Sequence, residues 1–145
     1  MTKLTITIDN HPDPQDIRSV INQLVEYNNS QTEKDVYDPL AIWVRDGDST
    51  IVAGLVGKTH WGWLYISHLW VDEALRGQGY GRKLMLDAEE VAKQRNCSHA
   101  YLDTFSFQAL GFYQRLGYQI FGVLENFPPG HQRYFLQKNL VHKNT

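Results

Sequence analysis

Apolar and polar residues alternate along this chain with two different periods, and these periods predict its secondary structure. Leu4, Ile6 and Ile8 alternate with threonines at the period of a β-strand. Asp13 and Pro14 then supply a helix N-cap and a proline at the first helical position, and apolar residues recur at helical spacing up to about residue 28. This second segment is predicted to be an amphipathic helix that packs on a sheet.

The middle of the chain predicts a hairpin, a central strand and a long helix. Residues 40–45 and 49–58 are β-rich runs joined by Asp46-Gly47-Asp48. Residues 63–71 are almost continuously apolar, as expected of a central strand covered on both faces. Residues 79–94 carry an apolar stripe and an opposite charged stripe, and they form the clearest helix of the chain.

The last third of the chain predicts shorter elements. Residues 100–104 are expected to form a strand, residues 107–116 a helix, and residues 118–124 and 132–140 two final strands. Two prolines and a glycine at 128–130 separate these last strands. The chain shows no repeat, low-complexity tract or linker, so residues 1–145 are predicted to be a single domain.

Composition and charge exclude several functional classes. The chain is 42% hydrophobic and 21% charged, as in ordinary globular proteins. Its net charge of -2, with both signs mixed along the chain, is unlike that of a nucleic-acid binder. Cys97 is the single cysteine, which rules out an internal disulfide framework and fits a reducing compartment. No apolar stretch resembles a signal peptide or a membrane span, so we expect a cytoplasmic protein that does not bind membranes.

A glycine-rich loop, residues 76–82, lies between the central strand and the long helix. Closely spaced glycines let backbone N–H groups converge on an anion, and the helix adds the positive end of its dipole. Arg76, Arg82 and Lys83 add cationic donors, so the loop predicts a polyphosphate site. It lacks the ending of a P-loop, and its spacing misses the dinucleotide pattern. Asp103 lies where a ribose-binding acid would lie in a dinucleotide-binding domain, so a dinucleotide-dependent redox domain is one alternative. A plain glycine-rich turn without a ligand is the other.

Two sequence blocks resemble the GNAT superfamily of N-acetyltransferases. The first is Arg76-Gly77-Gln78-Gly79-Tyr80-Gly81, preceded by a strand that ends in Val71, and the second is residues 110–118. The resemblance implies an α/β (α+β) fold with a mixed, mostly antiparallel sheet of six to seven strands flanked by about four helices. It also implies acetyl-CoA as the acetyl donor, a small-molecule or peptide amine as the acceptor, and a homodimer as a common state of such proteins.

The same resemblance assigns residues to the binding of coenzyme A. Backbone groups of Leu69, Trp70 and Val71 would hold the pantetheine arm where two strands separate. Backbone amides of the loop would hold the pyrophosphate; the residues expected to contact the cofactor there are Arg76, Gly77, Gln78, Gly79, Tyr80, Gly81 and Arg82. Ser106 occupies a position where the family often has an asparagine that contacts coenzyme A.

Direct acetyl transfer needs a proton for the leaving thiolate, a polarised carbonyl and an unprotonated amine. Tyr113 resembles the family tyrosine that faces the sulfur, so we predict it as the general acid, with filling of the core as the alternative role. The resemblance places the Val71 amide near the thioester oxygen, as its polariser. Asp103 is the first candidate base and His68 the second; each has an ordinary structural role as its alternative. Asp72 and Glu125 are further possible proton acceptors.

The histidines show no metal-binding spacing, so no metal is predicted. The function predicted from the sequence is therefore direct acetyl transfer from acetyl-CoA to a primary amine. The alternative is a catalytically silent module that binds coenzyme A as a sensor or partner.

Overall fold

The computed structural model describes residues 2–34 and 36–140, and the chain divides into two compact units, Met1–Asp35 and Val36–Thr145. The first unit contains helix α1, Pro14–Gln31. This helix begins as predicted, because the Asp13 side chain accepts a hydrogen bond from the Gln15 N–H at 2.8 Å. Pro14 takes the first helical position.

The strand predicted at residues 4–8 does not form in the first unit. Residues 2–9 have no regular secondary structure. An isolated strand is unstable without a hydrogen-bonded neighbour, and the described residues 2–34 contain no second strand. The alternation of threonine and aliphatic residues was therefore a misleading signal for this segment.

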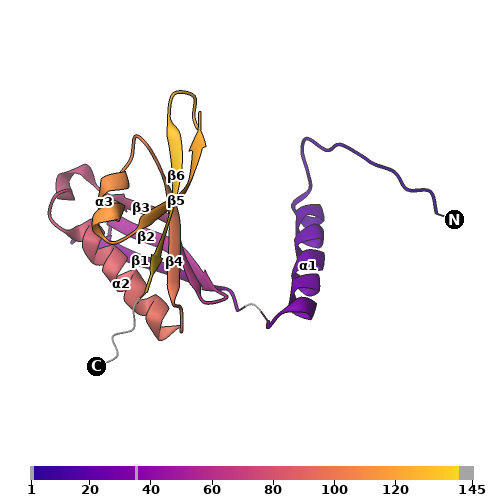
Figure 1. Ribbon diagram of the computed structural model, residues 1–145, viewed down its shortest axis with the longest axis horizontal. Coiled ribbons are helices and arrows are strands. Elements are labelled where there is room, and N and C mark those ends of the chain that lie inside the picture. The colour runs from indigo at the N-terminus through magenta and orange to yellow at the C-terminus, as the bar shows by residue number, and fades with distance from the viewer. Residues whose placement is uncertain (1, 35, 141–145) are drawn as a thin grey trace. The chain divides into compact units, whose positions relative to one another are not determined.

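The second unit is built around a six-stranded sheet with the order β1-β2-β3-β4-β6-β5 (Figure 1). Only β3 and β4 run parallel, and all other neighbouring pairs are antiparallel. The predicted mixed, mostly antiparallel sheet is confirmed, including the hairpin of its first two strands. The strands are β1 Asp38–Arg45, β2 Ile51–His60, β3 Trp63–Val71, β4 His99–Phe105, β5 Gln119–Glu125 and β6 Gln132–Asn139.

The helices of the second unit are α2, Tyr80–Gln94, and α3, Leu110–Arg115, with a short 3-10 helix, η1, at Glu73–Leu75. With α1, the described residues contain three α-helices, so the prediction of about four was slightly too high. The helix predicted from residue 107 begins later, because the Gln108 side chain accepts a hydrogen bond from the Phe105 N–H at 2.9 Å and holds a turn there.

One face of the sheet packs against α2 and α3 (Figure 1). Helix α2 buries Leu84, Met85, Ala88 and Ala92 on this side, as its apolar stripe predicted. The strand residues that meet them alternate with partly exposed ones, and they include Leu55, Leu64, Ile66, Ala100, Leu102 and Leu136. The expectation that residues 63–71 are buried on both faces is wrong within this unit, since only Leu64 and Ile66 of β3 are buried.

Strands β3 and β4 pair only over their first halves. Their parallel ladder stops at Ile66 and Leu102, whereas β3 stays paired with β2 as far as Val71. A register shift opposite Val56 and Gly57 leaves Ser67 as an extra residue in β3, and such a bulge bends and twists a strand. Beyond this point β3 and β4 separate, and a gap opens in the middle of the sheet.

Gly57 makes this bulge possible. A Cβ atom at this position would lie 2.4 Å from the carbonyl oxygen of Tyr65, a distance that no side chain tolerates. Glycine therefore lets the backbones of β2 and β3 approach each other closely just before β3 turns away from β4.

Candidate active site between strands β3 and β4

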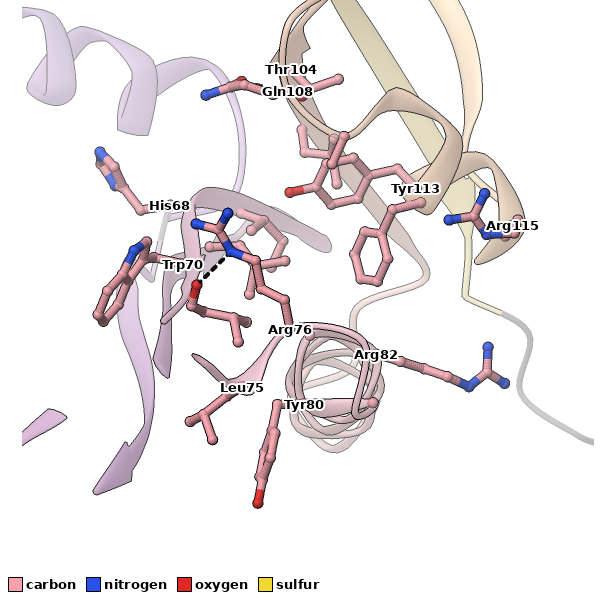
Figure 2. Close-up of a pocket in the computed structure, with 18 of the residues that line it drawn as sticks. His68, Trp70, Leu75, Arg76, Tyr80, Arg82, Thr104, Gln108, Tyr113 and Arg115 are labelled. Atoms are coloured by element: carbon pink, nitrogen blue, oxygen red, sulfur yellow. Dashed lines mark hydrogen bonds between the residues drawn. The ribbon is translucent and has the colours of Figure 1, made fainter. Parts of the chain in front are cut away.

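A pocket of about 910 Å³ lies where β3 and β4 separate. Its wall is formed by the second half of β3, the loop that leads into α2, the end of β4 and the start of α3 (Figure 2). Of the residues predicted to contact the cofactor, Leu69, Trp70, Val71, Arg76, Gly77, Gly79, Tyr80, Gly81 and Arg82 line it. The candidate catalytic residues His68, Asp103 and Tyr113 line it too.

The backbone of β3 presents hydrogen-bonding groups to this pocket. The Asp72 N–H donates to the Val52 carbonyl at 2.9 Å, so it points towards β2. Because successive peptide groups of a strand point to opposite sides, the N–H groups of Leu69 and Val71 point towards β4, which has moved away. Arg76 Nε donates to the Val71 carbonyl at 3.1 Å and fixes the loop against the end of the strand (Figure 2).

The glycine-rich loop forms the lower part of the wall. Gly77 and Gly79 adopt φ values of 76° and 88°, which favour glycine, and a Cβ atom at either would meet no protein atom within 4 Å. The first backbone hydrogen bond into α2 is donated by the Lys83 N–H to the Gly79 carbonyl at 3.0 Å. The preceding N–H groups of the first turn thus have no intrahelical partner and remain available to an anion.

Three arginines line the pocket, and two of them were predicted from the sequence. Arg76 and Arg82 extend from the loop and the first turn of α2, whereas Arg115 comes from α3. Figure 2 shows the Arg115 guanidinium on the same side of the pocket as that of Arg82. Gln78 is not part of the wall; its side chain donates to the Ala74 carbonyl at 3.2 Å and so supports the loop from behind.

Tyr113 is anchored in the core and directs its hydroxyl group into the pocket (Figure 2). Its side chain is 9% exposed and packs edge-on against Tyr118, with ring centroids 6.2 Å apart. Burial, with a smaller effect of the nearby Asp103 carboxylate, raises the pKa of Tyr113 to about 12. The hydroxyl therefore stays protonated at neutral pH and is a hydrogen-bond donor to any charge that develops in front of it.

His68 is exposed rather than buried in the strand, and its hydrogen bonds define its tautomer. The Ser67 hydroxyl donates to the Val56 carbonyl at 3.0 Å, and the same oxygen lies 2.9 Å from His68 Nδ1. Because a carbonyl only accepts, the Ser67 proton is used there, and Nδ1 of His68 must be the donor of the second bond. The lone pair of neutral His68 is therefore on Nε2, where it can accept a proton.

A family model described as the Acetyltransferase (GNAT) family matches residues 7–118 of the chain. The chain belongs to this family. GNAT enzymes use acetyl-CoA as the acetyl donor, so the predicted family, enzyme class and donor are confirmed.

Relatives and solved structures agree with this assignment. The chain is 39% identical to an acetyltransferase of Agrobacterium fabrum over 121 residues, which cover 83% of this chain and 88% of that protein. It is 41% identical to a blasticidin-S acetyltransferase of Streptomyces morookaense over 91 residues, 62% of this chain and 67% of that protein. A crystal structure of an acetyltransferase from Bacillus cereus superposes with a TM-score of 0.84 at 34% identity, covering 92% and 97% of the two chains.

Asp103 is engaged in an ion pair at the GNAT pocket. Its Oδ1 lies 2.8 Å from Arg133 Nε, and both side chains are partly buried. Burial, followed by the effect of the Asp103 carboxylate, raises the pKa of Tyr65 on the neighbouring strand. The Asp103 carboxylate is therefore already paired with Arg133. No local sequence signal could reveal this ion pair, because the two residues are thirty positions apart.

Ser106 lies outside the pocket wall of this GNAT protein, so the structure does not group it with the other predicted cofactor residues. Its hydroxyl oxygen accepts from the Gln132 N–H at 3.1 Å and lies 3.1 Å from His131 Nδ1. Gln108, two residues further along the chain, lines the wall instead. Its Oε1 accepts from the Phe105 N–H and from the Thr104 hydroxyl, at 2.9 and 3.2 Å. With the oxygen fixed, the Nε2 group forms the outer end of this side chain (Figure 2).

A buried polar network connects the helices of the GNAT fold behind Tyr113. Glu89 of α2 is 5% exposed and accepts from the Tyr118 hydroxyl at 2.9 Å and from Lys138 Nζ at 2.7 Å. Each carboxylate oxygen therefore has a donor, which removes most of the cost of burying the charge. The network fixes α2 relative to β6 and to the chain that follows α3.

Two features are absent from the described part of the chain. No group of three or more histidine, cysteine, aspartate or glutamate side chains is arranged to hold a metal ion in the part of the chain that the structure describes. No helix within residues 2–34 and 36–140 is long and apolar enough to cross a membrane.

Proposed function

We propose that this protein transfers the acetyl group of acetyl-CoA directly to a primary amine of a small molecule. The observation that carries the proposal is that one pocket contains both the N-terminus of α2 and the hydroxyl group of Tyr113. The relative named for blasticidin S supports a small-molecule acceptor. The single cysteine fits the reducing cytoplasm, which we keep as the expected location.

The residues present fit coenzyme A. The open space at Gly77 and Gly79 and the unpaired N–H groups of the first turn suit a pyrophosphate, and Arg76 and Arg82 lie beside them. The outward N–H groups of Leu69 and Val71 suit the amides of an extended pantetheine arm, which would add to β3 like a strand. Gln108 Nε2 offers one more donor at the opposite wall.

The chemistry is the exchange of a C–S bond for a C–N bond. The nitrogen of the neutral amine attacks the thioester carbonyl carbon, the bond to sulfur breaks, and the amine loses one proton. The Val71 N–H is the donor that we assign to the carbonyl oxygen as negative charge develops on it. Tyr113 donates a hydrogen bond to the departing sulfur, which leaves as a thiolate and takes from solvent a proton equal to the one that the amine has lost.

We assign removal of the amine proton to His68 rather than to Asp103. Neutral His68 holds its lone pair on Nε2 through the Ser67 hydrogen bond, whereas the Asp103 carboxylate is held by Arg133. His99 is the matched comparison. It is the first residue of β4, its ring stacks on Trp63 with ring centroids 4.5 Å apart, and it does not line the pocket.

The assignment of the base predicts different effects for two identical substitutions. His68→Gln should lower kcat/KM by about 10²-fold or more, the usual contribution of a positioned base. His99→Gln should leave the rate within about three-fold of the wild type, because His99 does not line the pocket. Equal activity of the His68→Gln variant and the wild type at saturating amine would show that water or Asp103 takes the proton.

The function itself is tested by calorimetric titration with acetyl-CoA, with NADH as the control ligand, followed by thiol release with a panel of amines. Micromolar binding of acetyl-CoA and amine-dependent thiol release are expected. Binding without release from any amine would favour a silent coenzyme A module. Binding of NADH in place of acetyl-CoA would favour a dinucleotide-dependent function.

A further inference from the structure

The pocket lies beyond the end of the β3–β4 ladder, and the residues that line it come from both faces of these strands. Side chains of a strand alternate between its two faces. Leu102 and Thr104 of β4 are buried on the α2 side, so Asp103 and Phe105 lie on the other. On β3, Leu69 and Val71 pack towards the core, and Trp70 therefore lies on the same side as Phe105. The α2 side holds the phosphate cradle, so the acceptor must approach from this second side.

Aromatic rings gather on this second side. Phe105 and Phe107 stack with ring centroids 5.5 Å apart and an angle of 9° between their planes, and Phe127 lies 5.6 Å from Phe105. We call Phe105, Phe107 and Phe127 the aromatic patch. Phe107 is 57% exposed and Phe127 is 42% exposed, while Trp70, across the opening, is 51% exposed. Phe107 and Trp70 both line the pocket, so the aromatic patch is continuous with it.

The aromatic patch is held rigidly rather than exposed by a loose loop. The Arg133 guanidinium lies over the Phe105 and Phe127 rings, 5.3 and 5.0 Å from their centroids. The same group is held by its ion pair with Asp103. His131 packs edge-on against Phe107 at 5.1 Å. Rings that are fixed but exposed can stack on a ligand without a further loss of side-chain entropy.

The charges around the pocket argue against a polycationic acceptor. Asp103 is the only acidic residue among the described residues that line the pocket, and its charge is balanced by Arg133. A polyamine or an aminoglycoside would need several carboxylates to hold its additional ammonium groups. An acceptor with a single amine on a flat, apolar ring needs no such carboxylates.

We propose that the aromatic patch is an acceptor subsite, which selects primary amines attached to a planar aromatic or heteroaromatic ring. The inference rests on the proposed acetyl transfer and specifies its substrate class. The ring lies between Phe107 and Trp70, and the amine reaches through the opening between β3 and β4 towards the thioester. Stacking of one ring on a fixed phenyl group is expected to improve kcat/KM by about ten-fold over an amine of equal size without a flat ring.

The test compares acceptors that differ in planarity and charge. Thiol release from acetyl-CoA is measured with 2-phenylethylamine, 2-cyclohexylethylamine, spermidine and kanamycin. The expected order places 2-phenylethylamine first, with kcat/KM about ten-fold above that of 2-cyclohexylethylamine. Phe107→Leu should remove most of this difference, because it keeps an apolar side chain but loses the ring face. Phe121→Leu is the matched control, since Phe121 is 55% exposed on β5 and does not line the pocket.

A binding measurement separates the inference from the chemistry. The product N-acetyl-2-phenylethylamine should bind the free protein in a calorimetric titration and should bind the Phe107→Leu variant about ten-fold more weakly. A preference for spermidine or kanamycin, or equal rates with both ring amines in the wild type, would overturn the inference and leave the acetyl transfer standing. Absence of thiol release with every amine would refute the acetyl transfer and the inference together.

Discussion

Tyr113→Phe removes one hydroxyl group from the pocket and leaves an aromatic ring of the same shape in the core. The ring is 9% exposed and keeps its edge-on contact with Tyr118. None of the hydrogen bonds among the described residues uses the Tyr113 hydroxyl, so the variant should fold as the wild type does. Any change of rate then reports on the reaction and not on the structure.

The size of the effect follows from the acidity of the buried phenol. Burial raises the pKa of Tyr113 to about 12, whereas a thiol ionises near pKa 8.5, so complete proton transfer to the thiolate is unfavourable by more than about 10³-fold. Tyr113 is therefore expected to act as a hydrogen-bond donor to the sulfur as its charge develops. A hydrogen bond to a charged group contributes about 1.5–3 kcal/mol, which corresponds to a loss of roughly 10-fold to 150-fold in kcat.

The assay is thiol release at saturating acetyl-CoA and amine, with acetyl-CoA affinity measured separately by calorimetry. Affinity should stay within about two-fold, because the hydrogen bond forms mainly in the transition state. The raised pKa keeps the phenol protonated through pH 10, so the ratio of wild-type to variant rates should be constant between pH 7 and 10. An unchanged kcat in a chemistry-limited assay would remove Tyr113 from the mechanism. A ratio that collapses between pH 8 and 9 would contradict the effect of burial.

Two further substitutions test the cradle and the support behind the site. Gly79→Val should weaken acetyl-CoA binding by at least about ten-fold in a calorimetric titration, because the position has a φ of 88° and its side chain would enter the space assigned to phosphate. Gly130→Val is the control, because Gly130 has a similar φ of 84° but lies outside the pocket, and it should leave acetyl-CoA binding unchanged. Tyr118→Phe should lower the free energy of unfolding by about 2 kcal/mol in a denaturant titration, because the buried Glu89 carboxylate loses a hydrogen-bond donor. A change below about 0.5 kcal/mol would mean that Lys138 alone is a sufficient donor for this carboxylate.

Much of the fold could be predicted because its signals are local. The N-cap at Asp13, the apolar stripe of α2 and the limits of β3 are written in residues close together in the sequence, and all three agree with the structure. The prediction of a strand at residues 4–8 was wrong, because its local signal contains no information about a pairing partner. Alternation shows that a segment can form a strand, but pairing with a neighbour decides whether it does.

The candidate site also contains some residues that local motifs predicted and others that only the fold shows. The glycine-rich loop and Tyr113 were predicted from two short motifs, and the structure brings both to one pocket. Arg115 was missed, because only the position of α3 in the fold brings it to the pocket that Arg76 and Arg82 also line. Gln108 was missed because only the turn after β4 shows that its oxygen is held and its nitrogen is not.

The sequence by itself determined the order of most elements, the place of the glycine-rich loop and the family of the protein. The tertiary structure decided which residues meet across the gap between β3 and β4. The bulge at Ser67, the tautomer of His68 and the ion pair of Asp103 with Arg133 all depend on contacts between distant segments. Local periodicity carries no information about such contacts, because hydrogen bonds and ion pairs require only proximity in space and not in sequence.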